Sequence, residues 1–169
     1  MKALIISDSH GLRDELLVIS ERHMNNVDVM IHCGDSELEL NGKELQDYKV
    51  VRGNCDFIGA FPEELVHNLG EYKLFATHGH LYGIKQSLQS LYYRSQEVGA
   101  KIVCFGHSHI MGAELINGVL FINPGSILLP RLRKEKTYAI LEIIENQASV
   151  TFYTINGEIF LTTRYEIGA

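Results

Sequence analysis

The sequence has few of the features that mark membrane-spanning, secreted or disulfide-linked proteins. No apolar run approaches the roughly 20 residues that a membrane-spanning helix needs, and the start lacks the basic region and long apolar stretch of a signal peptide. The three cysteines form no Cys-x-x-Cys pair or other zinc-finger spacing, so we expect reduced thiols. These absences predict a cytoplasmic protein that does not use a membrane.

Positive charge is also scarce. The formal net charge is −6, and an acidic chain of this kind predicts no extended nucleic-acid footprint. We interpret the single dense basic cluster as a solvated loop, with contact to an anionic substrate or partner as the alternative. The cluster consists of Arg131, Arg133, Lys134 and Lys136.

The size and composition are those of one globular domain. The chain has 169 residues, of which 46% are hydrophobic and 21% charged, which is enough to bury a sizeable core. No linker rich in Pro, Gly or Ser, no low-complexity tract and no repeat divides it. We therefore predict a single domain over residues 1–169.

Apolar runs alternate with helical patterns in the first half of the chain, whereas the last third reads as antiparallel strands joined by Asn-Gly turns. Alternation of this kind predicts a parallel sheet with helical crossovers. We expect an α/β fold in which two packed mixed sheets lie between helices, a four-layer α/β/β/α sandwich. The predicted helices are 13–23, 37–47 and 84–98, and the predicted strands are 2–7, 27–32, 48–51, 65–68, 72–76, 102–105, 113–116, 119–122, 138–144, 149–154 and 159–165.

Five short motifs rich in Asp, Asn and His follow predicted strands. Because the carboxyl ends of parallel strands open onto one edge of a sheet, their side chains can converge there. In extended strand-end segments, Asp8 and His10, or His107 and His109, would leave the backbone on the same side, and imidazole is the commonest transition-metal ligand. The motifs are Asp8-Ser9-His10, Gly34-Asp35, Gly53-Asn54, Thr77-His78-Gly79-His80 and Gly106-His107-Ser108-His109.

Each motif alone also has a structural interpretation. Asp8 could cap the following helix, Gly34-Asp35 is a common turn, and Asn54 tolerates left-handed turns. His80 could touch substrate or orient His78, and His32 is interpreted as a core histidine. The joint occurrence of five motifs at five predicted strand ends favours a two-metal hydrolase over a purely structural account.

The motif order, followed by Asn123-Pro124-Gly125-Ser126, resembles the calcineurin-like metallophosphoesterase superfamily and its small bacterial and archaeal phosphodiesterase branch. The resemblance covers nearly the whole chain. It implies that one metal is held by Asp8, His10 and His109, and the other by Asn54, His78 and His107, with Asp35 bridging the two. The expected catalytic residues are Asp35, Asn54 and His80.

The implied activity is phosphodiester hydrolysis by a hydroxide that two divalent metals activate, since metal coordination lowers the pKa of water from 15.7 to roughly 7. The resemblance favours manganese, while the ligand types also suit Fe, Ni or Zn. We expect a small phosphodiester or nucleotide-like substrate and leave a homo-oligomer open. The alternatives are a phosphomonoesterase or nuclease with the same site, and a non-catalytic protein-binding scaffold of the same fold.

One position departs from the wider superfamily. Many members have a histidine, implicated in protonating the leaving group, directly after the Gly-Asn pair, whereas this chain has Cys55 followed by Asp56. Beside two cations a cysteine would tend toward thiolate, which has no proton to donate. The proton then has to come from Asp56, His80 or the substrate.

Overall fold

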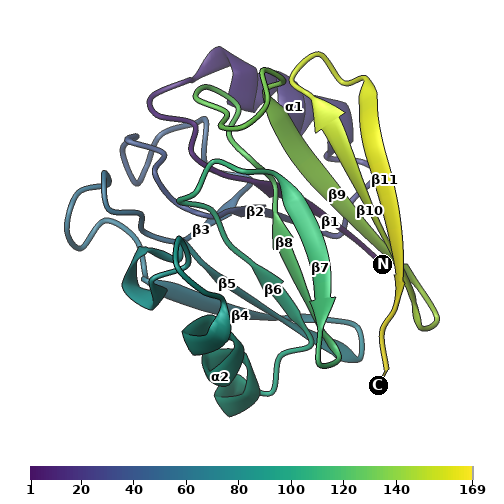
Figure 1. The fold of residues 1–169 in the computed structure, drawn as a ribbon. Helices are drawn as coiled ribbons and strands as arrows, with labels where there is room; N and C mark the ends of the chain where they lie inside the picture. The colour runs from purple at the N-terminus through teal and green to yellow at the C-terminus, as the bar shows by residue number, and fades with distance from the viewer. Residues whose placement is uncertain (169) are drawn as a thin grey trace.

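The computed structural model describes residues 1–168 and contains two mixed β-sheets (Figure 1). The six-stranded sheet has the order β11-β10-β9-β1-β2-β3, and the five-stranded sheet the order β4-β5-β6-β8-β7. The first sheet consists of β1 (Lys2–Ile6), β2 (Val29–His32), β3 (Lys49–Val50), β9 (Thr137–Ile144), β10 (Gln147–Thr154) and β11 (Ile159–Glu166). The second consists of β4 (Glu64–Leu69), β5 (Tyr72–Thr77), β6 (Ile102–Cys104), β7 (Gly112–Ile116) and β8 (Val119–Asn123).

Parallel pairing occupies one side of the six-stranded sheet and the centre of the five-stranded sheet. β1 pairs with β2 and β2 with β3 in parallel, as do β5 with β6 and β6 with β8. The remaining neighbours are antiparallel. The carboxyl ends of several central strands therefore lie at one edge, which is the arrangement that the motif positions require.

The strand β1 shows why its sequence is apolar throughout. Ala3 and Ile5 face the second sheet and belong to the core between the sheets, while Leu4 and Ile6 pack toward helix α1 (Asp14–His23) on the outer face. A strand covered on both faces has no solvent side, so its residues do not alternate with polar ones.

Two helices cover the outer faces of the paired sheets. α1 contributes buried Leu16 and Ile19 to the cluster on the six-stranded sheet, and α2 (Gln89–Val98) contributes Leu91 to the cluster on the five-stranded sheet. Figure 1 shows the two helices on opposite sides of the sheets. The four-layer α/β/β/α sandwich predicted from the sequence is therefore confirmed. No helix within residues 1–168 is long and apolar enough to cross a membrane.

One helix prediction was wrong, and another began too early. Residues 37–47 form turns rather than a helix, because Glu37 has a left-handed backbone with φ 54° and its N–H donates to the Asp56 carboxylate. The predicted helix 84–98 begins only at Gln89, after a 3₁₀ turn (His80–Tyr82) and the left-handed Gly83. The segment between Gly83 and Gln89 is left free to form one wall of a pocket.

Leu16 offers a test of the packing of α1. Its side chain is fully buried, whereas Val18 on the same helix is 50% exposed. We expect Leu16→Ala to lower the free energy of unfolding by about 2–5 kcal/mol, since it leaves a cavity in the core. Val18→Ala should change it far less. Denaturant unfolding of both variants measures the difference, and equal losses would contradict the packing described.

Candidate metal centre

The motif residues lie at the carboxyl edge of the sheets. Each segment leaves its strand within a few residues of the strand end, and backbone hydrogen bonds tie neighbouring segments together. Asp8 N donates to Gly34 O at 3.0 Å, and Gly106 N donates to His78 O at 3.1 Å. The segments follow β1 (Asp8, His10), β2 (Asp35), β3 (Asn54), β5 (His78, His80) and β6 (His107, His109).

Most of these residues have a left-handed backbone rather than the extended backbone expected from the sequence. The φ angles are 53° at Asp8, 44° at His10, 54° at Asp35, 66° at His107 and 58° at His109. Asp and His tolerate this region better than most residues, yet it remains sparsely populated outside glycine. The side chains therefore converge because the chain turns sharply after each strand, and not because the strands continue. Backbone strain of this kind clusters at functional sites.

Three candidate histidines are held by hydrogen bonds at the ring nitrogen that points away from the centre. An oxygen acceptor requires a proton on Nδ1, so in the neutral ring Nε2 is left as an electron-pair donor toward the centre. Metal-binding histidines in proteins are oriented in this way. The acceptors are Glu37 Oε1 for His10 at 2.5 Å, Cys33 O for His78 at 2.7 Å and Leu129 O for His109 at 2.7 Å.

These three Nε2 atoms surround one buried carboxylate oxygen. Asp8 Oδ1 lies 3.0 Å from His109 Nε2 and 3.9 Å from both His10 Nε2 and His78 Nε2. It is buried and has no partner in hydrogen-bonding geometry. His10 Nε2 and His109 Nε2 are only 3.4 Å apart. A buried acceptor facing other acceptors is costly unless a cation or protons compensate it.

A second group of acceptors adjoins the first. His78 Nε2 lies 3.3 Å from Asp35 Oδ2 and 3.2 Å from Asn54 Oδ1. The ring of His107 stands edge-on to that of His78, with 5.1 Å between centroids. The ligand atoms of Asp8, His10 and His109 lie within 4.8 Å of one another, and those of Asp8, Asp35 and His78 do so too. The structure thus brings together all seven residues predicted as metal ligands.

The donor set suits divalent cations. It offers imidazole nitrogens, carboxylate oxygens and one amide oxygen, and these ligands fit Mn, Fe, Ni or Zn. The orphaned Asp8 Oδ1 is the place where positive charge is missing. The residues therefore fit the kind of group that the sequence implied.

Charges inside the centre shift its pKa values in opposite directions. Burial alone would raise the pKa of Asp8, but the contact with His109 and the charge of His78 hold it below its usual range. Burial would also raise the pKa of Asp35. The contact with His78 and the hydrogen bond from the Cys55 N–H outweigh it and lower this pKa well below its usual range. The carboxylates stay ionised and demand cationic partners.

The histidines respond to the same carboxylates. Asp8 raises the pKa of His109 against the effect of burial. In His78, burial favours the neutral ring, but Asp35 and Asp8 prevail and raise the pKa. In the absence of metal, protons on these rings therefore supply part of the missing positive charge. His107 differs, because burial, followed by the charges of His78 and Lys85, lowers its pKa to about 4.

Asp56 organises the centre, a role that its place in the sequence did not reveal. Its Oδ2 accepts hydrogen bonds from the backbone N–H groups of Asp35 and Gly53, both at 2.8 Å. Its Oδ1 accepts from Glu37 N at 2.7 Å and from Ser36 Oγ at 3.1 Å. Four donors engage it, so Asp56 acts as an acceptor and joins the segment after β2 to the segment after β3. Gly53 permits this contact, since a Cβ there would lie 2.0 Å from Asp35 Oδ1.

The Asn123-Pro124-Gly125-Ser126 segment also positions candidate ligands, a role that the sequence did not predict. Asn123 Nδ2 donates to Gly106 O and to Ser108 Oγ, both at 3.0 Å, and so holds the turn that carries His107 and His109. Ser126 Oγ donates to Asp8 O at 2.7 Å.

His80 lies beside the candidate ligands. Its ring centroid is 5.4 Å from that of His78 and 6.1 Å from that of His107. Burial, followed by the charge of His78, lowers the pKa of His80, and its Nδ1 is buried without a hydrogen-bond partner. At neutral pH this ring is therefore neutral and retains an unused nitrogen.

Cys55 is exposed at the rim of the centre. Its N–H donates to Asp35 Oδ1 at 2.7 Å, and its thiol accepts from Asn54 Nδ2 at 3.3 Å. Desolvation, followed by the Asp35 carboxylate, raises the pKa of this thiol to about 11. Without metal the thiol thus keeps its proton.

Comparison with known proteins places this geometry in a family. Residues 1–146 match the model of the calcineurin-like phosphoesterase superfamily domain, and the chain belongs to that family. The chain is 57% identical over 157 residues, 93% of each protein, to the probable metallophosphoesterase YsnB of Bacillus subtilis. A crystal structure of a predicted phosphoesterase from Streptococcus pneumoniae superposes with a TM-score of 0.94 at 38% identity, covering 98% of this chain and 97% of that one.

Two more distant similarities concern part of the sequence and the fold. The chain is 30% identical over 102 residues to the phosphodiesterase YfcE of Escherichia coli, covering 54% of this chain and 50% of YfcE. Vps29 from Entamoeba histolytica, solved in complex with zinc, has the same fold, with a TM-score of 0.76 at 22% identity over 99% of this chain and all of that one. The family of this chain is thus that of metal-dependent phosphoesterases, and its fold is shared with a vacuolar protein sorting protein.

The centre predicts a pH-dependent stabilisation by metal. Mn²⁺ competes with protons for His78 and His109, and their raised pKa values mean that the metal-free form holds these protons to a higher pH than ordinary imidazoles do. Binding is therefore favoured as pH rises above 6.5. We expect Mn²⁺ to raise the melting temperature of metal-stripped protein, and more at pH 8 than at pH 6.

His78→Ala should blunt this rise, and His67→Ala should not, because His67 lies in the middle of β4. Differential scanning calorimetry measures the shifts. Identical melting curves with and without Mn²⁺ at both pH values would rule out the assigned centre.

Proposed function

We propose that the protein hydrolyses phosphodiester bonds with two divalent metal ions, manganese being the preferred one. Asp8, His10 and His109 would hold one ion, Asn54, His78 and His107 would hold the other, and Asp35 would be shared by both. The observation that carries this proposal is the buried Asp8 Oδ1, which lacks a hydrogen-bond donor and faces the Nε2 atoms of three histidines. Membership in the phosphoesterase family and similarity to the phosphodiesterase YfcE support it.

The charges favour an anionic substrate although the protein is acidic. Two divalent ions contribute +4 and the carboxylates of Asp8 and Asp35 contribute −2, so the pocket presents net positive charge to a phosphate. When bound, such ions lower the pKa of water toward 7 and neutralise charge that develops on phosphoryl oxygens.

The residues around the ions keep the ligands in place and contact the substrate. Glu37, Cys33 O and Leu129 O fix three imidazoles in the tautomer that points Nε2 inward. Asp35 is held by the hydrogen bond from Cys55 N. His80, neutral and with an unused nitrogen beside His78 and His107, is positioned to hydrogen-bond a phosphate oxygen or a departing group.

The scaffold alternative fits these residues less well. A protein that only binds partners through this fold has no need for inward-facing imidazoles or for a buried carboxylate oxygen without a donor, because such groups cost stability. The strained backbone at five ligand residues points the same way. A phosphomonoesterase or nuclease would use the same centre and differ in the surrounding pocket.

Asp35→Asn tests the bridging role. The change removes the charge that holds two cations side by side but keeps Oδ1, which accepts the Cys55 N–H. We expect the variant to lose at least one metal per chain and nearly all turnover, with the fold retained. Asp14→Asn removes the same charge at an exposed position in the first turn of α1 and should change neither. Metal analysis and hydrolysis of bis-p-nitrophenyl phosphate measure the effects. Full turnover in Asp35→Asn would refute the assignment.

A comparison of aryl and alkyl leaving groups tests whether Cys55 can act as a general acid. As a thiolate Cys55 has no proton to give, and as a thiol with a pKa of about 11 it is far from the pKa near 7 that suits a general acid. Asp56 is engaged by four donors, and burial lowers the pKa of His80. We therefore expect rapid cleavage of aryl diesters, whose leaving group needs little protonation, and slow cleavage of alkyl diesters.

Cys55→His should raise the alkyl rate selectively, since general acid catalysis is typically worth 10²- to 10⁴-fold. Cys55→Ser serves as the control for the loss of the thiol. The comparison is between kcat values for an aryl and an alkyl diester in the three proteins. If the native protein cleaves both substrates equally fast, another group already protonates the leaving group, and the prediction for Cys55 is wrong.

A further inference from the structure

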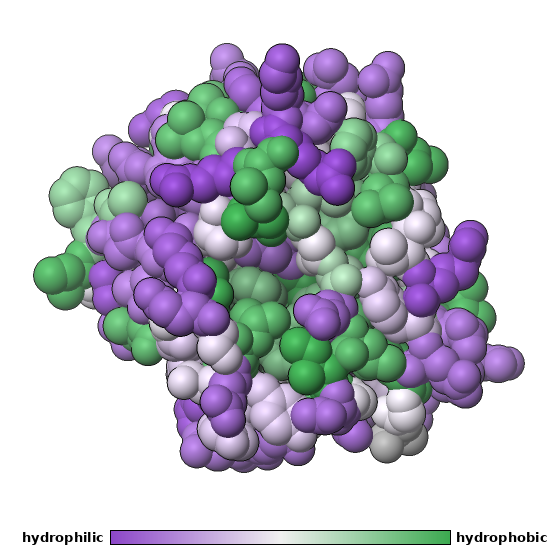
Figure 2. Space-filling model, viewed as in Figure 1, coloured by the Kyte–Doolittle hydropathy of each residue, from purple (hydrophilic) through white to green (hydrophobic). Residues whose placement is uncertain are grey.

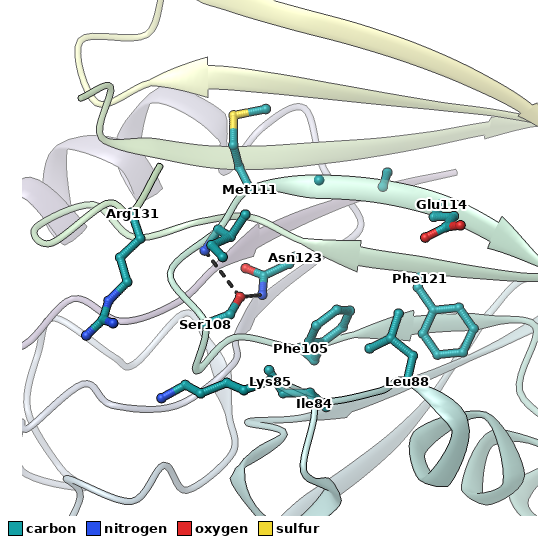
Figure 3. A pocket seen from close by; sticks show the side chains of 13 residues that line it. Ile84, Lys85, Leu88, Phe105, Ser108, Met111, Glu114, Phe121, Asn123 and Arg131 are labelled. Atoms are coloured by element: carbon teal, nitrogen blue, oxygen red, sulfur yellow. Dashed lines mark hydrogen bonds between the residues drawn. The ribbon is translucent and has the colours of Figure 1, made fainter. Parts of the chain in front are cut away.

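A pocket of about 450 Å³ adjoins the metal centre on the outer face of the five-stranded sheet. Figure 2 shows a hollow with a hydrophobic floor in the middle of this face. Phe105, just after β6, and Phe121, on β8, form the floor, and Ile84 and Leu88 form one wall (Figure 3). The volume lies in the range of about 300–1,000 Å³ that small-molecule sites occupy.

The pocket exists because one helix begins late and one strand residue lacks a side chain. α2 begins only at Gln89 and packs against β5 and β6 through Leu91, next to Phe75 and Val103. On β7, the position that pairs with Asn123 is Gly112, and a Cβ there would meet no atom within 4 Å. Val119 and Phe121 on β8 are buried in the same cluster as Leu91, and the outer face stays open only toward Gly112 and Asn123.

Two residues that line the pocket are direct neighbours of candidate metal ligands. Ser108, which lines it, stands between the candidate ligands His107 and His109. Arg131, also in the lining, donates its backbone N–H to His109 O at 3.0 Å. Any group bound at the centre thus lies beside the mouth of the pocket.

Its polarity is divided between two ends. Lys85 and Arg131 extend at one end, and Glu114 and Phe121 lie at the other, with Phe105 between them (Figure 3). The charge of Lys85 acts on His107, and that of Arg131 on His109. Both cations are thus on the side of the metal centre, where they complement an anion. The rest of the lining is mainly apolar and includes two aromatic rings.

We propose that this pocket binds a flat aromatic substituent of the substrate, while the phosphate to which it is attached lies at the metal centre between Lys85 and Arg131. This inference rests on the proposed function and narrows the substrate class to diesters with at least one aromatic or nucleoside-type group. Burial of such a group against Phe105 and Phe121 removes apolar surface from water, and aromatic pairs favour offset or edge-on contacts.

Two stable phosphonate monoanions test the proposal through binding rather than turnover. The monomethyl esters of phenylphosphonic and methylphosphonic acid carry the same charge and differ only in the phenyl group. We expect Mn²⁺-loaded native protein to bind the phenyl ligand about 10-fold or more tightly, because burying an aromatic side group is worth this much in affinity. Isothermal titration calorimetry measures both dissociation constants.

Gly112→Leu fills the pocket with a side chain on the same face as Asn123, and its φ lies outside the left-handed region. It should abolish most of the phenyl preference and leave the methyl ligand within about twofold of native affinity. Gly112→Ala should fold in any case and cause a smaller loss. Thr162→Leu, on the edge strand β11 of the other sheet, adds a leucine far from the pocket and should alter neither constant.

The outcomes separate the two proposals. Equal affinity of the native protein for both ligands, or a phenyl preference that survives Gly112→Leu, overturns the pocket assignment while phosphodiester hydrolysis stands. A pocket built for another occupant, such as a protein segment, would give the first of these results. Failure of Mn²⁺-loaded protein to bind either phosphonate overturns the phosphate site, and with it both proposals.

Discussion

The arrangement of the carboxyl edge follows from one electrostatic constraint, the crowding of electron-pair donors around the Asp8 carboxylate. Asp8 Oδ1 is buried without a donor, and three imidazole Nε2 atoms face it within 3.9 Å. Such a centre is stable only with positive charge inside it, supplied by protons or by metal. The network around it serves to keep these donors from turning away. Asp56 joins two segments through four hydrogen bonds, and Ser126 and Asn123 hold two others.

The residue types of the site could be predicted from the sequence because strand ends of a parallel sheet share an edge. Asp8, Asp35 and His78 each follow an apolar run, and the structure gathers them as the motifs indicated. Their backbone geometry could not be predicted in this way. Sharp left-handed turns depend on contacts with other segments, such as the bond from His107 N to Asp8 Oδ2 at 3.1 Å, and no local pattern encodes a contact between residues 99 positions apart.

The sequence pattern does not distinguish a structural histidine from a candidate ligand histidine. His32 and His78 both lie at the end of an apolar strand and both are buried. Gly34 N donates to His32 Nδ1 at 3.1 Å, so the ring proton is on Nε2 and can be donated to Ser9 Oγ at 2.8 Å. His78 has the opposite arrangement, with Cys33 O accepting from Nδ1. Burial lowers the pKa of His32 to about 4, so it remains a neutral structural residue. The hydrogen-bond partner of Nδ1 distinguishes the structural His32 from the candidate ligand His78. This partner depends on the tertiary structure and cannot be identified from the local sequence.

The turn segment at residues 37–47 links fold and site in a similar way. A helix there would satisfy the local pattern. It would, however, move the Glu37 carboxylate away from His10 Nδ1, from which Oε1 now lies 2.5 Å, and turn the Glu37 N–H away from Asp56. The tertiary hydrogen bonds prevail because they satisfy the buried Asp56 carboxylate and hold the His10 ring beside the buried Asp8. On the other sheet, the late start of α2 leaves the face beside His107 and His109 open. At both positions the chain lacks regular structure close to the candidate metal centre, where the backbone orients candidate ligands or leaves room beside them.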